Sequence, residues 1–174
     1  MEYSLSKSTE VLERTPLVLR ALLMGVSDEW LLSNEGPDTF SPFDVVGHLT
    51  YGEKTDWTAR IKLILASGDK QPFEKYDRFA MFEESKGKSI TDLLEEFETL
   101  RAANLAWLRS LELQPGDLLK QGLHPVLGNV TLKNLLATWA VHDLTHIAQI
   151  SRVMAKQYKT EIGPWTEFFR VLNF

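Results

Sequence analysis

The sequence has no cysteine among its 174 residues. This absence excludes disulfide bonds, thiolate metal ligands and a cysteine nucleophile, and it fits a reducing compartment. No apolar run approaches the roughly 20 residues that a membrane-spanning helix needs. The first segment, residues 1–14, carries charges throughout and lacks the apolar core of a signal peptide. Together these absences predict a cytoplasmic protein.

Positive charge is also scarce in this chain. It has 19 Lys and Arg against 24 Asp and Glu, which gives a formal net charge of −5, and no stretch is rich in Lys or Arg. A nucleic-acid partner therefore has no electrostatic support. Internal repeats and low-complexity stretches are absent, and no segment alternates convincingly between apolar and polar residues. Helices are thus the expected elements.

Apolar residues make up 44% of the chain, which is enough for a hydrophobic core. The length is normal for one compact domain, so residues 1–174 are predicted to form a single domain. The first helix is expected over about residues 6–25, with a kink or a restart at Pro16 and Thr15 as a cap. The second is expected from its N-cap Ser41 to about residue 67.

Two more long helices follow in the sequence pattern. Residues 89–111 carry the cleanest amphipathic spacing, and residues 131–158 form a helix that Gly163-Pro164 cannot continue. The stretch between them, with several Pro and Gly residues, is expected to be a loop, and a short C-terminal helix is expected at about residues 165–172. Four long helices with short connections predict an all-α protein, a four-helix bundle.

The apolar stripe of the last long helix carries two histidines, His142 and His146. They are four residues apart and therefore lie one above the other on one face, where both rings can reach a single ion. Hydrogen-bonded packing explains the pair as well as ligation does, because His-x-x-x-His is common by chance. The stripe consists of Leu132, Leu135, Trp139, His142, His146, Ile150 and Val153.

His48, near the buried face of the second helix, supplies a third ligand to this pair. Its neighbour Gly47 leaves room for another backbone or side chain to come close. Three protein ligands leave at least one metal position open for water or substrate. The sequence therefore predicts one divalent metal ion on His48, His142 and His146.

Two familiar helical metal motifs do not fit this chain. The zincin motif needs His-Glu-x-x-His, but the string here is His142-Asp143-Leu144-Thr145-His146, which argues against a protease. Di-iron bundles need paired Glu-x-x-His motifs, and the sequence has none. Neither a protease nor a di-iron protein is therefore expected.

Four neighbouring residues have open roles. Asp143 either orients a ligand ring or a bound water, or is a solvated residue one step off the core face. Gln149 either lines the pocket or makes a hydrogen bond between helices, and Glu53 is expected to be structural or paired at the surface. His124 is expected to be solvent-exposed in its loop, with a role as fourth ligand or substrate contact as the alternative. Three tryptophans are expected in the core: Trp57, Trp107 and Trp139.

Two stretches resemble a known family. Residues 135–150 read LLATWAVHDLTHIAQI and are similar to the last-helix motif of the DinB-like (DinB/YfiT-like) superfamily. Residues 41–49, SPFDVVGHL, are similar to its second-helix motif, and residues 163–165, GPW, resemble one branch of it. The resemblance implies an up-down-down-up bundle, often a homodimer. It also implies zinc or nickel on a histidine triad that maps onto His48, His142 and His146.

The resemblance leaves the reaction open, since its characterised relatives include thiol-dependent transferases and isomerases. One expectation is a metal-dependent enzyme with an unknown small-molecule substrate. Its metal would lower the pKa of a bound water towards ~7, or bind a low-molecular-weight thiol, for hydrolysis or thiol transfer. The alternative is a non-catalytic, metal-binding stress-response protein in which the metal joins two helices. An open metal position favours the enzyme, and a fourth protein ligand favours the structural role.

Overall fold

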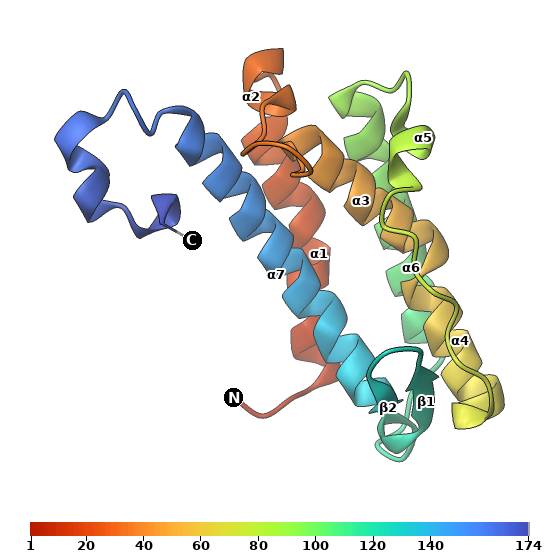
Figure 1. Ribbon diagram of the computed structural model, residues 1–174. Coiled ribbons are helices and arrows are strands. Elements are labelled where there is room, and N and C mark those ends of the chain that lie inside the picture. Colours follow the sequence, from red (N-terminus) through yellow and green to blue (C-terminus); the bar gives the residue numbers. More distant parts are fainter. Residues whose placement is uncertain (174) are drawn as a thin grey trace.

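The computed structural model describes residues 1–173, and four long helical segments dominate it (Figure 1). They run up, down, down and up along the bundle, which confirms the expected topology. The first is α1 (Leu5–Leu23), the second is α3 (Pro42–Thr55) continued by α4 (Trp57–Ser67), the third is α6 (Ile90–Ser110) and the fourth is α7 (Leu132–Gln157). A short helix that was not expected, α2 (Asp28–Leu32), follows α1.

Residues 68–89, here called the crossover segment, join the lower end of α4 to the upper end of α6 (Figure 1). Two neighbouring segments that both run downwards need such a long return connection. It contains a 3-10 turn, η1 (Gly68–Lys70), and a short helix, α5 (Met81–Ser85). Helix α5 packs on Gly47 of α3, where an added Cβ would lie 2.5 Å from the Ser85 hydroxyl. The expected close approach at Gly47 is therefore confirmed.

Side-chain caps start the long helices where the sequence indicated. In each of three caps, the side-chain hydroxyl accepts a hydrogen bond from the backbone N–H three residues later, and the side chain of that later residue accepts one from the backbone N–H of the cap. The caps are Ser41, Ser89 and Thr131. The second helix is interrupted at Asp56, which separates α3 from α4. Backbone hydrogen bonds still run through the break, from Asp56 N to Gly52 O and from Arg60 N to Asp56 O, each 3.0 Å.

The expected restart at Pro16 is wrong, because α1 continues from Leu5 to Leu23 without a break. Pro16 has no N–H to donate to the carbonyl of Leu12, so that carbonyl lacks its helical partner. Arg101 of α6 donates to it instead, at 2.7 Å. Thr15 is not a cap, since its hydroxyl donates to the carbonyl of Val11. A side chain from another helix thus replaces the hydrogen bond that proline removes.

Two further expectations for loops and ends need correction. The loop before α7 contains a 3-10 turn, η2 (Asp117–Leu119), and an antiparallel hairpin of β1 (Gln121–His124) and β2 (Gly128–Thr131). Its strands are too short to show an alternating pattern. The expected C-terminal helix is instead two 3-10 segments, η3 (Gly163–Phe168) and η4 (Arg170–Leu172). Within residues 1–173, no helix is long and apolar enough to cross a membrane.

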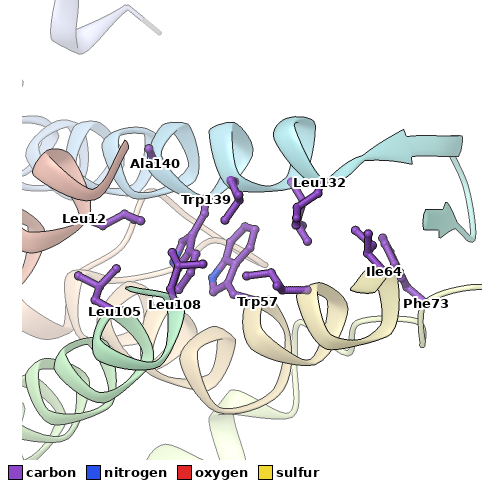
Figure 2. Close-up of a cluster of buried hydrophobic side chains, with 12 residues drawn as sticks. Leu12, Trp57, Ile64, Phe73, Leu105, Leu108, Leu132, Trp139 and Ala140 are labelled. Atoms are coloured by element: carbon purple, nitrogen blue, oxygen red, sulfur yellow. The ribbon is translucent and has the colours of Figure 1, made fainter. Parts of the chain in front are cut away.

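The core consists of two apolar clusters separated by a polar layer. The lower cluster, with Trp57 and Trp139 at its centre, fills the space between α1, α4, α6 and α7 (Figure 2). The upper cluster contains Phe97 and Val45 and lies nearer to α2. Arg101 lies between them in the chain, after Phe97 of the upper cluster and before Leu105 of the lower one.

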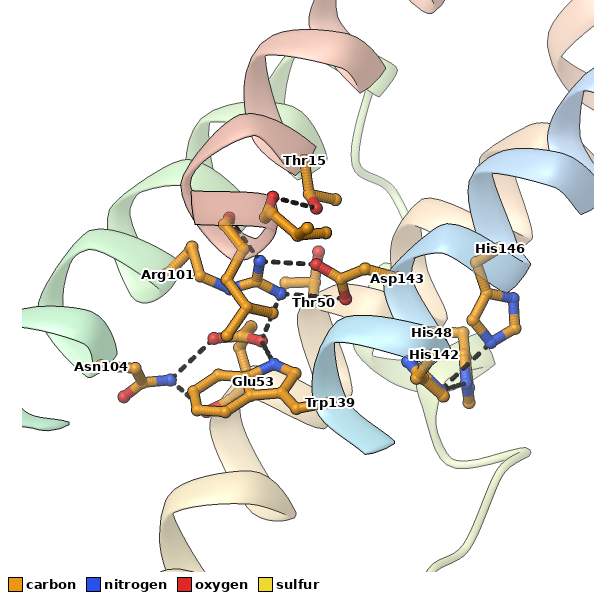
Figure 3. Close-up of polar contacts among 12 residues, drawn as sticks. Thr15, His48, Thr50, Glu53, Arg101, Asn104, Trp139, His142, Asp143 and His146 are labelled. Atoms are coloured by element: carbon orange, nitrogen blue, oxygen red, sulfur yellow. Dashed lines mark hydrogen bonds and ion pairs between the residues drawn. The ribbon is translucent and has the colours of Figure 1, made fainter. Parts of the chain in front are cut away.

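Arg101 forms the centre of the polar layer, and only 1% of it is exposed (Figure 3). Its Nη1 and Nη2 donate to the two carboxylate oxygens of Asp143 on α7, at 2.6 and 3.1 Å. Nη2 also donates to Glu53 on α3 at 2.8 Å, and Nη1 donates to Leu12 on α1. This Arg101 network therefore contacts all four long helices. Asn104 and Trp139 complete it, donating to Glu53 at 2.9 and 3.0 Å.

Replacing Arg101 with methionine should destabilise the protein strongly. The substitution keeps an apolar side chain in place but leaves Glu53 and Asp143 buried without their cation. Removing one partner of a buried ion pair costs about 3–5 kcal/mol. We expect the free energy of unfolding of the metal-free protein, measured in urea, to fall by that amount.

Arg109→Met is the matched control on the same helix. Arg109 pairs with Glu13, but both side chains are well exposed. Such surface pairs contribute about 0–1 kcal/mol. Equal losses of stability in the two variants would contradict the central role given to Arg101.

Candidate metal centre

Three histidine rings meet beside the Arg101 network (Figure 3). His48 comes from α3, and His142 and His146 come from α7. The Nε2 atom of His142 lies 3.1 Å from Nε2 of His48 and 3.1 Å from Nε2 of His146. The three ligand atoms all lie within 4.8 Å of one another. Two nitrogens bound to one tetrahedral zinc at 2.0–2.1 Å would be about 3.3 Å apart, so this histidine triad has the spacing of a ligand set.

Hydrogen bonds at the Nδ1 atoms aim two of these rings. Nδ1 of His146 lies 2.7 Å from the amide oxygen of Gln149, which can only accept. Nδ1 of His48 lies 3.3 Å from the hydroxyl of Tyr76, and that hydroxyl lies 3.5 Å from the His48 carbonyl. A proton on Nδ1 of His146 leaves a lone pair on its Nε2, and Tyr76 can favour the same arrangement in His48, while the buried Nδ1 of His142 has no hydrogen-bond partner. Nε2 lone pairs that converge need an electrophile between them. The residues present therefore fit a divalent cation.

Burial keeps the triad in the neutral form that binds metal. It lowers the pKa of His48 to about 4 and that of His142 to about 2, and the charge that a protonated His146 would carry adds to both shifts. Burial also lowers the pKa of His146, and the hydrogen bond to Gln149 partly opposes this. Unperturbed imidazole has a pKa of about 6.5. Protons consequently compete less for these nitrogens than for free imidazole.

An aromatic layer connects the triad to the Arg101 network. The Trp57 ring meets the His142 ring edge to face, with centroids 5.1 Å apart. Trp57 also stacks on Trp139 at 5.5 Å, and Trp139 donates its indole N–H to Glu53. The contacts that hold Glu53 therefore also fix the surface on which His142 rests.

A cavity of about 390 Å³ opens beside the triad. His48 and His142 form part of its wall, and the rest comes from α3, Asp56, α4, the crossover segment, the hairpin and α7. Most of this lining is apolar, with Trp57, Phe73 and Leu135 among its residues. His48 and His142 are thus reachable by a small molecule.

The neighbouring residues are placed as follows. Asp143 is fully buried and bonded through both oxygens to Arg101 and not to a ligand ring, so the expectation of a solvated residue is wrong, and a role towards a bound water stays a prediction. Glu53 is structural, as one expectation had it, but buried rather than at the surface. Gln149 contacts His146 on its own helix and is not among the residues that line the cavity, so its role in the pocket stays a prediction. His124 is half-buried on β1, lines the cavity and is not one of the three grouped ligands.

The three tryptophans expected in the core are placed as follows. Trp57 and Trp139 are in the core, and Trp107 is half-buried and packs against it.

Sequence reasoning missed two residues that build the site. Arg101 lies four residues after Phe97 and four before Leu105, on the apolar face of α6. Glu53 and Asp143 likewise occupy apolar faces, and opposite charges on three such faces are a signal of a buried network. Tyr76 had no such signal, because it lies in the irregular crossover segment.

The fold is an up-down-down-up bundle, and its triad of neutral histidines has the geometry of a divalent metal site. These two features place the chain among helical-bundle proteins with a candidate metal site. Comparison with known proteins gives the family. The model of the DinB superfamily matches residues 12–150, so the chain belongs to the DinB superfamily. No curated protein matches it.

A solved structure resembles this chain over nearly its full length. It is YfiT from Bacillus subtilis, described as a probable metal-dependent hydrolase with an unusual four-helix bundle topology. The two share 25% sequence identity with a TM-score of 0.74, and the match covers 93% of this chain and 91% of YfiT.

The metal-free protein should lose stability as the pH falls below about 6.5. The unfolded chain has histidines of ordinary pKa and binds protons there, whereas folded His48 and His142 stay neutral until the pH approaches about 4 and about 2. Their stabilisation is therefore complete above about pH 6.5 and is lost progressively in acid. Urea unfolding at several pH values should show a smaller acid loss for His142→Leu than for the wild type. Parallel pH profiles would contradict the lowered pKa of His142.

Proposed function

We propose that this chain is a metal-dependent enzyme in which His48, His142 and His146 hold one divalent ion, zinc or nickel, and that its reaction is hydrolysis. The observation that carries the proposal is the open geometry of the triad. Three Nε2 atoms converge beside a cavity that His48 and His142 line, and within residues 1–173 no fourth His, Cys, Asp or Glu joins the group. Three-ligand sites are typical of catalytic metals, whereas structural zinc sites have four protein ligands.

A divalent ion at this site would supply Lewis-acid activation of a water or of a thiol. The chain itself contributes orientation and exclusion of solvent. Gln149 and Tyr76 hold two ligand rings through their Nδ1 atoms, and Trp57 supports the third. The apolar cavity wall shields a bound substrate from bulk water. The description of YfiT as a probable metal-dependent hydrolase favours water over a thiol as the nucleophile.

A purely structural metal is the weaker alternative. Its task would be to join α3 to α7 through His48 and His142. Arg101 already joins these two helices through Glu53 and Asp143, without any metal. The bundle therefore has a link at this level that does not depend on the ion.

The test begins with elemental analysis of protein purified without an affinity tag. We expect about one zinc or nickel ion per chain, lost in the His48→Ala/His142→Ala double variant and kept in His124→Ala, the control. Metal-loaded protein is then assayed with a panel of activated esters and amides, with and without low-molecular-weight thiols. Hydrolysis should stop on chelation and return with metal.

Two results would overturn this function. Stoichiometric metal in the double variant would remove the triad assignment. Turnover that requires a thiol, with no hydrolysis in its absence, would replace hydrolysis by thiol transfer at the same site.

We also propose a two-fold homodimer. Trp165 and Phe168 of η3 are 66% and 74% exposed, and Phe169, between η3 and η4, is 47% exposed. This C-terminal part extends beyond the bundle (Figure 1). Exposed aromatic clusters of this kind are typical of interfaces, and two-fold dimers are the commonest symmetric assembly. Light scattering should give twice the chain mass of 19.9 kDa, and Phe168→Ser should shift the protein towards monomer. A monomer mass at high concentration would refute the dimer.

A further inference from the structure

The end of the cavity nearest the hairpin is built from hydrogen-bond donors. Arg60 of α4, His124 of β1 and Asn134 in the first turn of α7 all line the cavity. The guanidinium of Arg60 lies 5.2 Å from the centre of the Phe73 ring, and the His124 ring lies 6.2 Å from the same ring. Arg60 is twelve residues beyond His48, which is about 18 Å along the helix. This donor end is therefore distinct from the triad.

Hydrogen bonds to neighbouring residues determine which atoms of His124 and Asn134 are free to bind a ligand. Nδ1 of His124 accepts the backbone N–H groups of Val126 and Leu127, at 3.2 and 3.1 Å. The proton of the neutral ring must then be on Nε2, which becomes a donor. The Asn134 oxygen accepts from the backbone and the hydroxyl of Thr131, which leaves its NH₂ group.

Arg60 forms an ion pair with Asp56. Its Nε lies 2.6 Å from a carboxylate oxygen of Asp56, but the buried Nε–H has no hydrogen-bond partner and remains available to a ligand. The charges lining the cavity are Arg60, Arg78 and Asp56, which sum to +1 in a chain of net charge −5. Arg78 is exposed and lies over the Phe79 ring, and within residues 1–173 no carboxylate forms an ion pair with it. The cavity is thus locally positive in an acidic protein, which favours an anion.

We propose that the hairpin end of this cavity binds the anionic group, a carboxylate or a phosphate monoester, of a ligand whose body is apolar. The Nη groups of Arg60, the Nε2–H of His124 and the NH₂ of Asn134 bind its oxygens. The apolar walls around Trp57 and Leu135 enclose its body. Anion binding at the hairpin end does not depend on the function proposed above. The further statement that the other end of the ligand reacts at the triad does rest on that proposed function.

The test is calorimetric titration of zinc-loaded protein with octanoate and octyl phosphate, and with 1-octanol and octylamine as neutral and cationic matches. The two anions should bind at least about tenfold more tightly than octanol, as charge-assisted hydrogen bonds to a guanidinium imply. A preference between octanoate and octyl phosphate identifies which anion the site takes. Equal affinities for octanoate and octanol would overturn the proposal.

Variants of one ion pair give effects of opposite sign. Arg60→Met should weaken octanoate binding at least about tenfold, and Arg60→Lys should have an affinity between those of Arg60→Met and the wild type. Asp56→Asn removes the opposing negative charge and should increase the octanoate affinity by roughly two- to threefold. Octanol binding should not change in any of them. Arg14→Met, which removes an exposed arginine of α1 outside the cavity, is the control and should leave octanoate binding unchanged. Unchanged octanoate affinity in both Arg60→Lys and Asp56→Asn would contradict the proposal even if Arg60→Met fails to fold.

The His48→Ala/His142→Ala variant separates this inference from the proposed function. Octanoate binding that depends on Arg60 should persist in it. If octanoate binds the wild-type protein but not this variant, its carboxylate binds the metal. That result would overturn the anion site and would leave the metal site unaffected. Arg60-dependent binding in a protein that takes up no metal would support the anion site while the proposed function fails.

Discussion

One buried guanidinium determines how the four long helices fit together. Arg101 bonds to a backbone carbonyl of α1 and to carboxylates of α3 and α7 while it belongs to α6 itself. Its fork has a fixed planar geometry, so these partners can be satisfied together in only one relative placement of the helices. Asp143 directly follows His142 in the chain, and Glu53 lies five residues after His48. Fixing the two carboxylates therefore fixes the height at which the histidines of α3 and α7 meet.

The Arg101 network lies between two apolar clusters, and this position explains how it specifies one arrangement of the helices. Apolar contacts alone are not directional, and they would let neighbouring helices slide or rotate against one another. Burying charges is costly, and such groups are retained in some proteins because they specify one arrangement. Here the arrangement brings three Nε2 atoms together beside a cavity. The network also joins α3 to α7 without a metal, so a metal ion bound at the triad would not be needed for this link.

Local signals in the sequence predicted much of the fold, and contacts between distant segments explain the rest. The caps at Ser41, Ser89 and Thr131 need only neighbouring residues, so the helix starts could be predicted. The histidine triad followed from spacing on one helix and a family resemblance, and the resemblance alone supplied the bundle topology. Pro16 removes a hydrogen bond as expected, but its replacement comes from Arg101, far away in the chain. The pattern of α7 alone places Asp143 one step off the apolar face, but its partner, Arg101, lies on α6.

The Arg101 network positions three histidines, and a metal ion bound by them would keep an open position. X-ray absorption spectroscopy of the metal-loaded protein measures this directly. We expect three imidazole nitrogens at about 2.0–2.1 Å and at least one solvent oxygen around a zinc ion. Four protein ligands with no solvent position, or a metal whose imidazole shell is unchanged in His48→Ala, would contradict it.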